Sequence, residues 1–91
     1  MSKLQDLTTL LRNRADWPED FEWDYSDITH CAVGLACEVG LIRGKRPSRV
    51  EGADFDISDA AFDAIFMTWG RGGPDAVTPQ MVVRRIERLA L

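Results

Sequence analysis

The chain lacks the long apolar run that a membrane-spanning helix requires. Its longest uncharged apolar stretch, residues 31–37, ends at Glu38 and is far shorter than the ~20 residues of a membrane span. Charged residues near the N-terminus occupy the place where a secretory signal peptide begins its apolar region. We therefore expect a cytoplasmic protein with no membrane partner.

Cysteine and histidine are scarce, which limits the available catalysis. The two cysteines, Cys31 and Cys37, would lie about 9 Å apart along one helix, beyond the ~7 Å between Cα atoms that a disulfide permits. We expect free thiols, as is usual in a reducing compartment. His30 is the single histidine, and on a helix it would point roughly 100° away from Cys31. The two side chains should therefore not form a catalytic pair.

Motifs for metals and cofactors are also missing. No Cys-x-x-Cys or His-x-x-x-His pair occurs, and Asp27, His30 and Cys31 would supply too few zinc ligands. The glycine-rich run 70–74 lacks the Lys-Ser/Thr of a phosphate-binding loop. We expect no catalytic residue, no cofactor and no metal. A small thiol-dependent enzyme or factor built on Cys31 is the alternative, because a cysteine near a helix N-terminus has a lowered pKa.

Acidic and basic residues are segregated along the chain, whose net charge is −4. The acidic segment, residues 16–27, has six acids and no base, and the basic loop, residues 43–49, has four bases and no acid. The acidic segment supplies one set of candidate binding residues: Asp16, Glu19, Asp20, Glu22 and Asp24. The basic loop supplies the other: Arg43, Lys45, Arg46 and Arg49. We therefore expect one face of the protein to be negatively charged and another to be positively charged.

The acidic segment favours a non-catalytic protein-binding module. A row of carboxylates can imitate a nucleic-acid backbone and occupy a basic groove on another protein, which would relieve the repulsion among the acids. The basic loop could contact nucleic acid, weakly and without sequence choice. Nucleic acid is the less favoured partner, because the protein is acidic and that loop has no aromatic residue for base stacking. A solvated loop that balances the acidic segment internally is the plainer alternative.

Apolar residues recur at spacings of three and four, which predicts a mainly α protein. We expect a single domain over residues 1–91, folded as a small four-helix orthogonal bundle. The predicted helices span about residues 2–14, 26–41, 58–70 and 78–89, and begin at the capping residues Ser2, Ser26 or Asp27, Ser58 and Thr78. The predicted core comprises Leu7, Leu11, Trp23, Ile28, Cys31, Leu35, Val39, Phe62, Ile65, Phe66, Trp69, Val82, Ile86 and Leu89.

Two segments fall between the predicted helices. Residues 21–25 alternate aromatic and acidic side chains, and extended backbone would turn the three rings inward and the two acids outward. A short strand is one interpretation of this segment, although no second strand is evident. Residues 43–57 are predicted as a loop because glycine and proline punctuate them.

Trp23 followed by Cys31-Ala32-x-Gly34-x-Ala36 resembles a pattern in small proteins of bacteria and their phages, in which a Trp precedes a C-A-x-G-x-A helix. Those chains end in a helix capped by Ser/Thr-Pro, as Thr78-Pro79 does here. The resemblance spans residues 21–42 and 76–89. No activity is established for that group, so it implies no site residue. It implies a phage-associated setting, in which an anti-CRISPR-like inhibitor would bind and block a host nucleoprotein complex.

Overall fold

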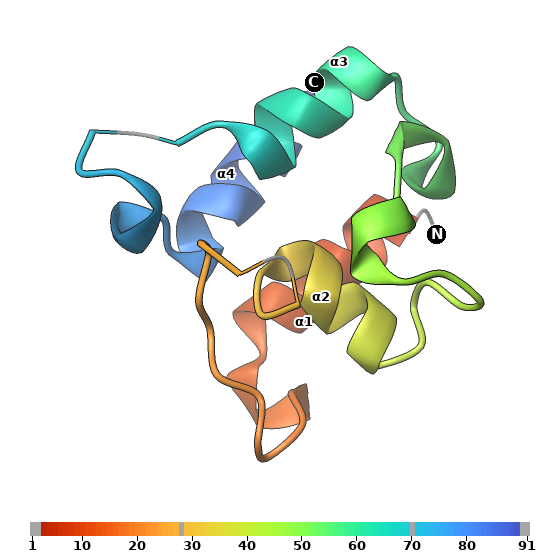
Figure 1. The fold of residues 1–91 in the computed structure, drawn as a ribbon, viewed down its shortest axis with the longest axis vertical. Helices are drawn as coiled ribbons and strands as arrows, with labels where there is room; N and C mark the ends of the chain where they lie inside the picture. Colours follow the sequence, from red (N-terminus) through yellow and green to blue (C-terminus); the bar gives the residue numbers. More distant parts are fainter. Residues whose placement is uncertain (1–2, 28, 70, 90–91) are drawn as a thin grey trace.

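The computed structural model describes residues 3–27, 29–69 and 71–89 (Figure 1). This part of the chain contains four α-helices: α1 (Lys3–Arg12), α2 (Ala32–Glu38), α3 (Asp59–Phe62) and α4 (Pro79–Leu89). It also contains the 3-10 turns η1 (Arg14–Asp16), η2 (Pro47–Arg49), η3 (Gly52–Phe55) and η5 (Pro74–Ala76), and the π-helical turn η4 (Asp63–Met67). The described residues form no strand, so the predicted small, mainly helical bundle is confirmed. None of the helices in these ranges is long and apolar enough to cross a membrane.

The core forms where α1 packs against α4, while α2 lies across α1 and η4 contacts α4 (Figure 1). Nine predicted core residues are buried: Leu7, Leu11, Cys31, Leu35, Phe62, Ile65, Phe66, Val82 and Ile86. Trp23 is half-buried and packs against them. Three predictions are wrong, because Val39, Trp69 and Leu89 are exposed. Ser2, Ile28 and Gly70 lie outside the described residues.

The second helix begins later and ends earlier than its sequence pattern predicts. It starts at Ala32, with Cys31 as the N-cap residue, rather than after residue 26 or 27. The carboxylates of Asp24 and Asp27 each accept a hydrogen bond from the backbone N–H two residues on, and such bonds compete with helix formation. The helix ends at residue 38, and Gly40 then takes a left-handed φ of +84°, which side chains other than glycine rarely adopt. Val39 is the C-cap residue of the helix and is 39% exposed.

The third helix starts where predicted and ends early. Ser58 Oγ accepts a hydrogen bond from the Ala61 N–H at 3.1 Å, which is the N-cap interaction. The helix then widens into η4 and stops at Met67, and Thr68 is extended with φ −95° and ψ 122°. This change of backbone direction removes Trp69 from the helical face, and its side chain is 62% exposed.

The first and last helices differ less from prediction. Helix α1 ends at Arg12 rather than near Arg14, where the 3-10 turn η1 takes over. Helix α4 has the predicted cap, since Thr78 Oγ1 accepts from the Met81 N–H at 3.3 Å and Pro79 is the first helical residue. Leu89 is the last residue of α4 and is 45% exposed.

Residues 43–57 are more ordered than the predicted loop, because η2 and η3 lie within them. A capping box starts η3: the side chains of Glu51 and Asp54 each accept from the other's backbone N–H. The turn places Phe55 in the core at 1% exposure. Gly52 allows this close packing, since a Cβ there would meet the carbonyl oxygens of Ile57 and Ser58 at 2.6 Å.

The aromatic and acidic alternation of residues 21–25 has the predicted orientation. The rings of Phe21 and Tyr25 are buried and that of Trp23 is half-buried, whereas Glu22 and Asp24 are exposed. The segment pairs with no strand in the described parts of the chain. This segment of residues 21–25, here called the strap, lies beside the bundle and exposes its carboxylates to solvent.

Candidate functional site: an acidic cleft beside Tyr25

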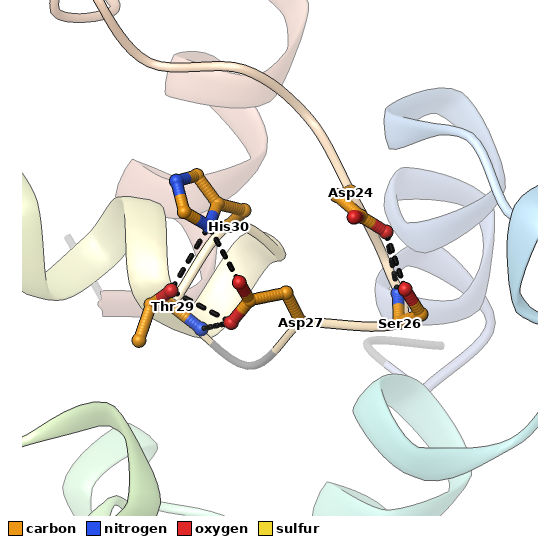
Figure 2. A network of polar contacts seen from close by, with 5 residues as sticks. All are labelled: Asp24, Ser26, Asp27, Thr29 and His30. Carbon is orange, nitrogen blue, oxygen red and sulfur yellow. Dashed lines mark hydrogen bonds and ion pairs between the residues drawn. The ribbon is translucent and has the colours of Figure 1, made fainter.

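Two consecutive turns form a network of polar contacts (Figure 2). In the first, Asp24 Oδ1 accepts hydrogen bonds from the Ser26 N–H at 3.0 Å and from Ser26 Oγ at 2.6 Å. In the second, Asp27 Oδ1 accepts from the Thr29 N–H at 2.9 Å and from Thr29 Oγ1 at 2.7 Å. The repeated Asp-x-Ser/Thr spacing lets each carboxylate bond its own backbone two residues on. Both carboxylates are thereby held in fixed positions.

His30 joins the second turn through one ring nitrogen. Its Nδ1 lies 2.9 Å from Asp27 Oδ2 and 2.9 Å from Thr29 Oγ1 (Figure 2). In a catalytic triad, the two imidazole nitrogens contact different partners, so that a proton can pass from the nucleophile to the ring. Here both the hydroxyl and the carboxylate meet the same nitrogen, and no such relay exists. The cluster is a structural turn rather than a Thr-His-Asp triad.

The hydrogen bonds keep Asp27 ionised. The side-chain hydroxyl and the backbone N–H of Thr29, with His30, lower the pKa of Asp27 from 3.8 to about 2. Donors that stabilise a carboxylate favour its charged form. Asp27 therefore carries a full negative charge at any physiological pH.

These turns form one wall of an open cleft of ≈ 370 Å³, here called the acidic cleft. Its lining comprises Glu22, Trp23, Asp24, Tyr25, Asp27, His30, Asp75 and Val77. The second wall comes from residues far along the chain and is tied to the first by Trp23, whose Nε1 donates to the Val77 carbonyl at 2.9 Å. The rings of Trp23 and Tyr25 stack at a centroid distance of 6.5 Å. Four carboxylates and two aromatic rings thus meet around one hollow.

The predicted acidic residues divide into three groups. Glu22 and Asp24 line the acidic cleft, whereas Asp20 lines a neighbouring hollow with Phe21, Thr29, His30 and Glu38. Asp16 and Glu19 are exposed and line neither hollow. Within the described ranges, no ion pair reaches Asp16, Glu19, Asp20 or Glu22. The charge of the acidic segment is therefore largely uncompensated.

Asp75 is a cleft residue that the sequence pattern does not identify. It stands in the 3-10 turn η5, some fifty positions from Asp24, and a turn aspartate is ordinary in composition. Its place in the cleft depends on the contact between Trp23 and Val77. Only the tertiary structure brings these residues together.

The basic loop is partly neutralised by its own neighbour. Lys45 Nζ lies 3.1 Å from Asp54 Oδ2 and 3.6 Å from Glu51 Oε1. The hydrogen bond to Asp54 is the main reason why the pKa of Lys45 is raised. Arg43 Nε donates to the Gly40 carbonyl at 3.1 Å. The loop thus balances η3, and its ion pairs in the described chain do not reach the acidic segment.

Two arginines of the basic loop stay available to solvent. Arg46 and Arg49 are exposed, and neither takes part in an ion pair within the part of the chain that the structure describes. Arg46 precedes the 3-10 turn η2, and Arg49 is its last residue. The fold does not gather them with the acidic residues into a common site.

Cys31 has the environment of a core thiol. Its side chain is 6% exposed, and burial raises the pKa of the thiol, although backbone N–H groups of Gly34 and Val33 oppose the shift. A raised pKa disfavours the thiolate that a cysteine nucleophile requires. This argues against the alternative of a thiol-dependent enzyme. Among the described residues, no three His, Cys, Asp or Glu side chains are placed to hold a metal ion.

Comparison with protein-family models, with curated proteins and with solved structures finds no match to this chain.

Proposed function

We propose that the chain is a non-catalytic protein-binding module, and that its acidic segment docks on a basic surface of another protein. The observation that carries the proposal is the acidic cleft, in which four carboxylates from two distant segments surround a hollow. The hydroxyl groups of Ser26 and Thr29 hold the carboxylates of Asp24 and Asp27 without neutralising them, and His30 Nδ1 lies 2.9 Å from the second Asp27 oxygen. The cleft therefore presents fixed negative charge to solvent.

The chemistry of the lining favours a lysine or arginine side chain as the group that enters. A guanidinium or ammonium group can pair with carboxylates while its methylene stem packs on apolar side chains. Trp23 and Tyr25 supply apolar surface beside Asp24. A nucleic acid would instead be repelled by the four carboxylates. A phage-type, anti-CRISPR-like inhibitor that fills the basic groove of a host nucleoprotein complex would act through this chemistry.

Charge-neutral variants test the proposal. The partner is captured from a host lysate on the immobilised chain, and its association and dissociation rates are then measured at two ionic strengths. We expect Glu22→Gln with Asp24→Asn to weaken binding on the order of tenfold, mainly through slower association. Asparagine keeps the Oδ1 acceptor for Ser26, so the turn should persist.

A matched control changes the same net charge elsewhere. Asp59 and Asp63 are exposed and lie outside the cleft, so Asp59→Asn with Asp63→Asn should leave binding within about twofold. If both double variants weaken binding equally, net charge rather than the acidic cleft governs the interaction. If only Arg46→Gln with Arg49→Gln abolishes binding, the partner is anionic and the proposal is wrong.

A further inference from the structure

An apolar groove lies on the other side of Tyr25 from the acidic cleft. It encloses ≈ 150 Å³ and is lined by Tyr25, Ser26, Cys31, Phe66, Met67 and Trp69. Two of its walls are unusual for a small globular domain, because Met67 is 55% and Trp69 is 62% exposed. Large exposed apolar side chains that gather at one place mark interaction sites more often than scattered ones do.

Hydrogen bonds fix the backbone of η4, which forms the floor of the groove. The Tyr25 hydroxyl donates to the Phe66 carbonyl, and Arg85 Nη1 donates to the Ile65 carbonyl at 3.1 Å. These contacts satisfy carbonyls at the end of the π-helical turn η4, which have no partner within the helix. Thr68 Oγ1 closes the turn by donating to the Asp63 carbonyl at 3.1 Å. These hydrogen bonds fix the end of η4, and Trp69, which follows that end, is left exposed to solvent.

The groove and the acidic cleft form one continuous surface. Tyr25 lines both hollows, and Ser26 in the groove is bonded to Asp24 in the cleft. We propose that the groove receives a large apolar side chain of the same basic partner segment whose cationic side chain enters the cleft. This inference rests on the proposed function. It commits to a protein segment in which an apolar residue stands next to lysine or arginine.

The composition of the joint surface supports this occupant. Protein interfaces concentrate Trp, Tyr and Met at their centres and leave charged residues at the rim. A space of roughly 150 Å³ can hold a benzene-sized group, which suits one leucine or phenylalanine side chain. The neighbouring carboxylates select an apolar side chain that has basic flanks.

The same charges disfavour a second copy of this chain as the occupant. A two-fold symmetric dimer brings the same patch of each copy together. Pairing through Trp69 would bring together two chains that each carry a net charge of −4, and like charges oppose association. A basic partner faces no such repulsion.

Two synthetic pentapeptides test the inference. The first has a leucine between two pairs of Lys and Arg, and the second has serine in its place, so that the two carry equal charge. Binding to the ¹⁵N-labelled chain is followed by NMR titration. We expect the leucine peptide to bind about tenfold more tightly, a difference of about 1.4 kcal/mol. Trp69→Ser should remove most of that preference, whereas Leu89→Ser, at an exposed residue outside the groove, should retain it.

The outcomes separate the inference from the proposed function. If both peptides bind equally and Glu22→Gln with Asp24→Asn weakens both, the groove inference is wrong and the acidic docking surface stands. If neither peptide binds even at low ionic strength, the proposed function fails and the inference falls with it. Self-association that Trp69→Ser abolishes would show that a second copy covers the groove, and would overturn the inference.

Discussion

Replacement of Phe55 by alanine should be among the most destabilising changes in this protein. The ring is 1% exposed and lies 5.3 Å from the Phe66 ring and 6.3 Å from the Phe62 ring, measured between centroids. Truncation of a buried phenylalanine to alanine costs about 3–5 kcal/mol, because apolar contacts are lost and a cavity remains. A domain of this size has a total stability of only about 5–15 kcal/mol. We expect Phe55→Ala to lower the free energy of unfolding by about 3 kcal/mol or more.

Urea denaturation followed by circular dichroism measures this change. A loss of about 3 kcal/mol would also lower Tm by more than 10 °C, since about 1 kcal/mol corresponds to roughly 4–8 °C in a domain of 60–100 residues. The matched control is Trp69→Ala, which removes a larger but 62% exposed ring and should cost less than about 1 kcal/mol. If the control destabilises more than Phe55→Ala, residue 69 belongs to the core and the packing of η3 and η4 described above is refuted.

Four other experiments test separate features of the structure. Gly52→Ala should destabilise by about 1–3 kcal/mol in urea denaturation, since its Cβ would meet backbone oxygens at 2.6 Å, and an unchanged midpoint would contradict that packing. Ala36→Leu should cost a similar amount by the same assay, because Ala36 is 0% exposed; a rise in Tm would mean that it faces open space. Native Cys31 should react with a thiol reagent far more slowly than in urea, and rapid native labelling would revive the thiol-enzyme alternative. An NMR titration should find the Asp27 carboxyl ionising near pH 2. Because this pKa lies below the ordinary 3.8, the ionised carboxylate stabilises the fold above pH 3.8, and this stabilisation is lost as the pH falls toward 2. The pH dependence should be absent from Asp27→Asn.

Local signals identified the elements whose structure depends on neighbouring residues alone. Ser58 and Thr78 cap their helices as the sequence predicts, because a hydroxyl three residues before a backbone N–H is sufficient. The inward rings of residues 21–25 follow equally from alternation in extended backbone.

The errors arise where two local interpretations compete. Asp27 is a good helix N-cap by residue type, yet its carboxylate bonds the N–H two residues on and closes a turn instead. The glycine and proline content of residues 43–57 suggested a loop, while the capping box of Glu51 and Asp54 supports a turn that buries Phe55. An acidic residue three positions after Glu51 was the available signal for that turn.

The acidic cleft could be predicted only in part. Glu22 and Asp24 were expected on the outer face of the strap, and both line the cleft. The opposite wall at Asp75 depends on a hydrogen bond from Trp23 to Val77, which spans 54 positions in the chain. The spacing of residues within one helix or segment cannot predict a contact between residues so far apart in the chain.

The turns that shorten α2 are also what create the candidate surface. Had the helix begun at residue 26, Asp27 and the residues after it would have formed the first turn of the helix, and the Asp27 turn would be absent. Because the Asp24 and Asp27 turns keep residues 24–27, 29 and 30 out of the helix, both carboxylates face the cleft and the Tyr25 hydroxyl reaches the Phe66 carbonyl. That last contact fixes Tyr25 as the wall shared by the acidic cleft and the apolar groove. The absence of helix before Ala32 therefore places an acidic cleft and an apolar groove side by side on this small domain.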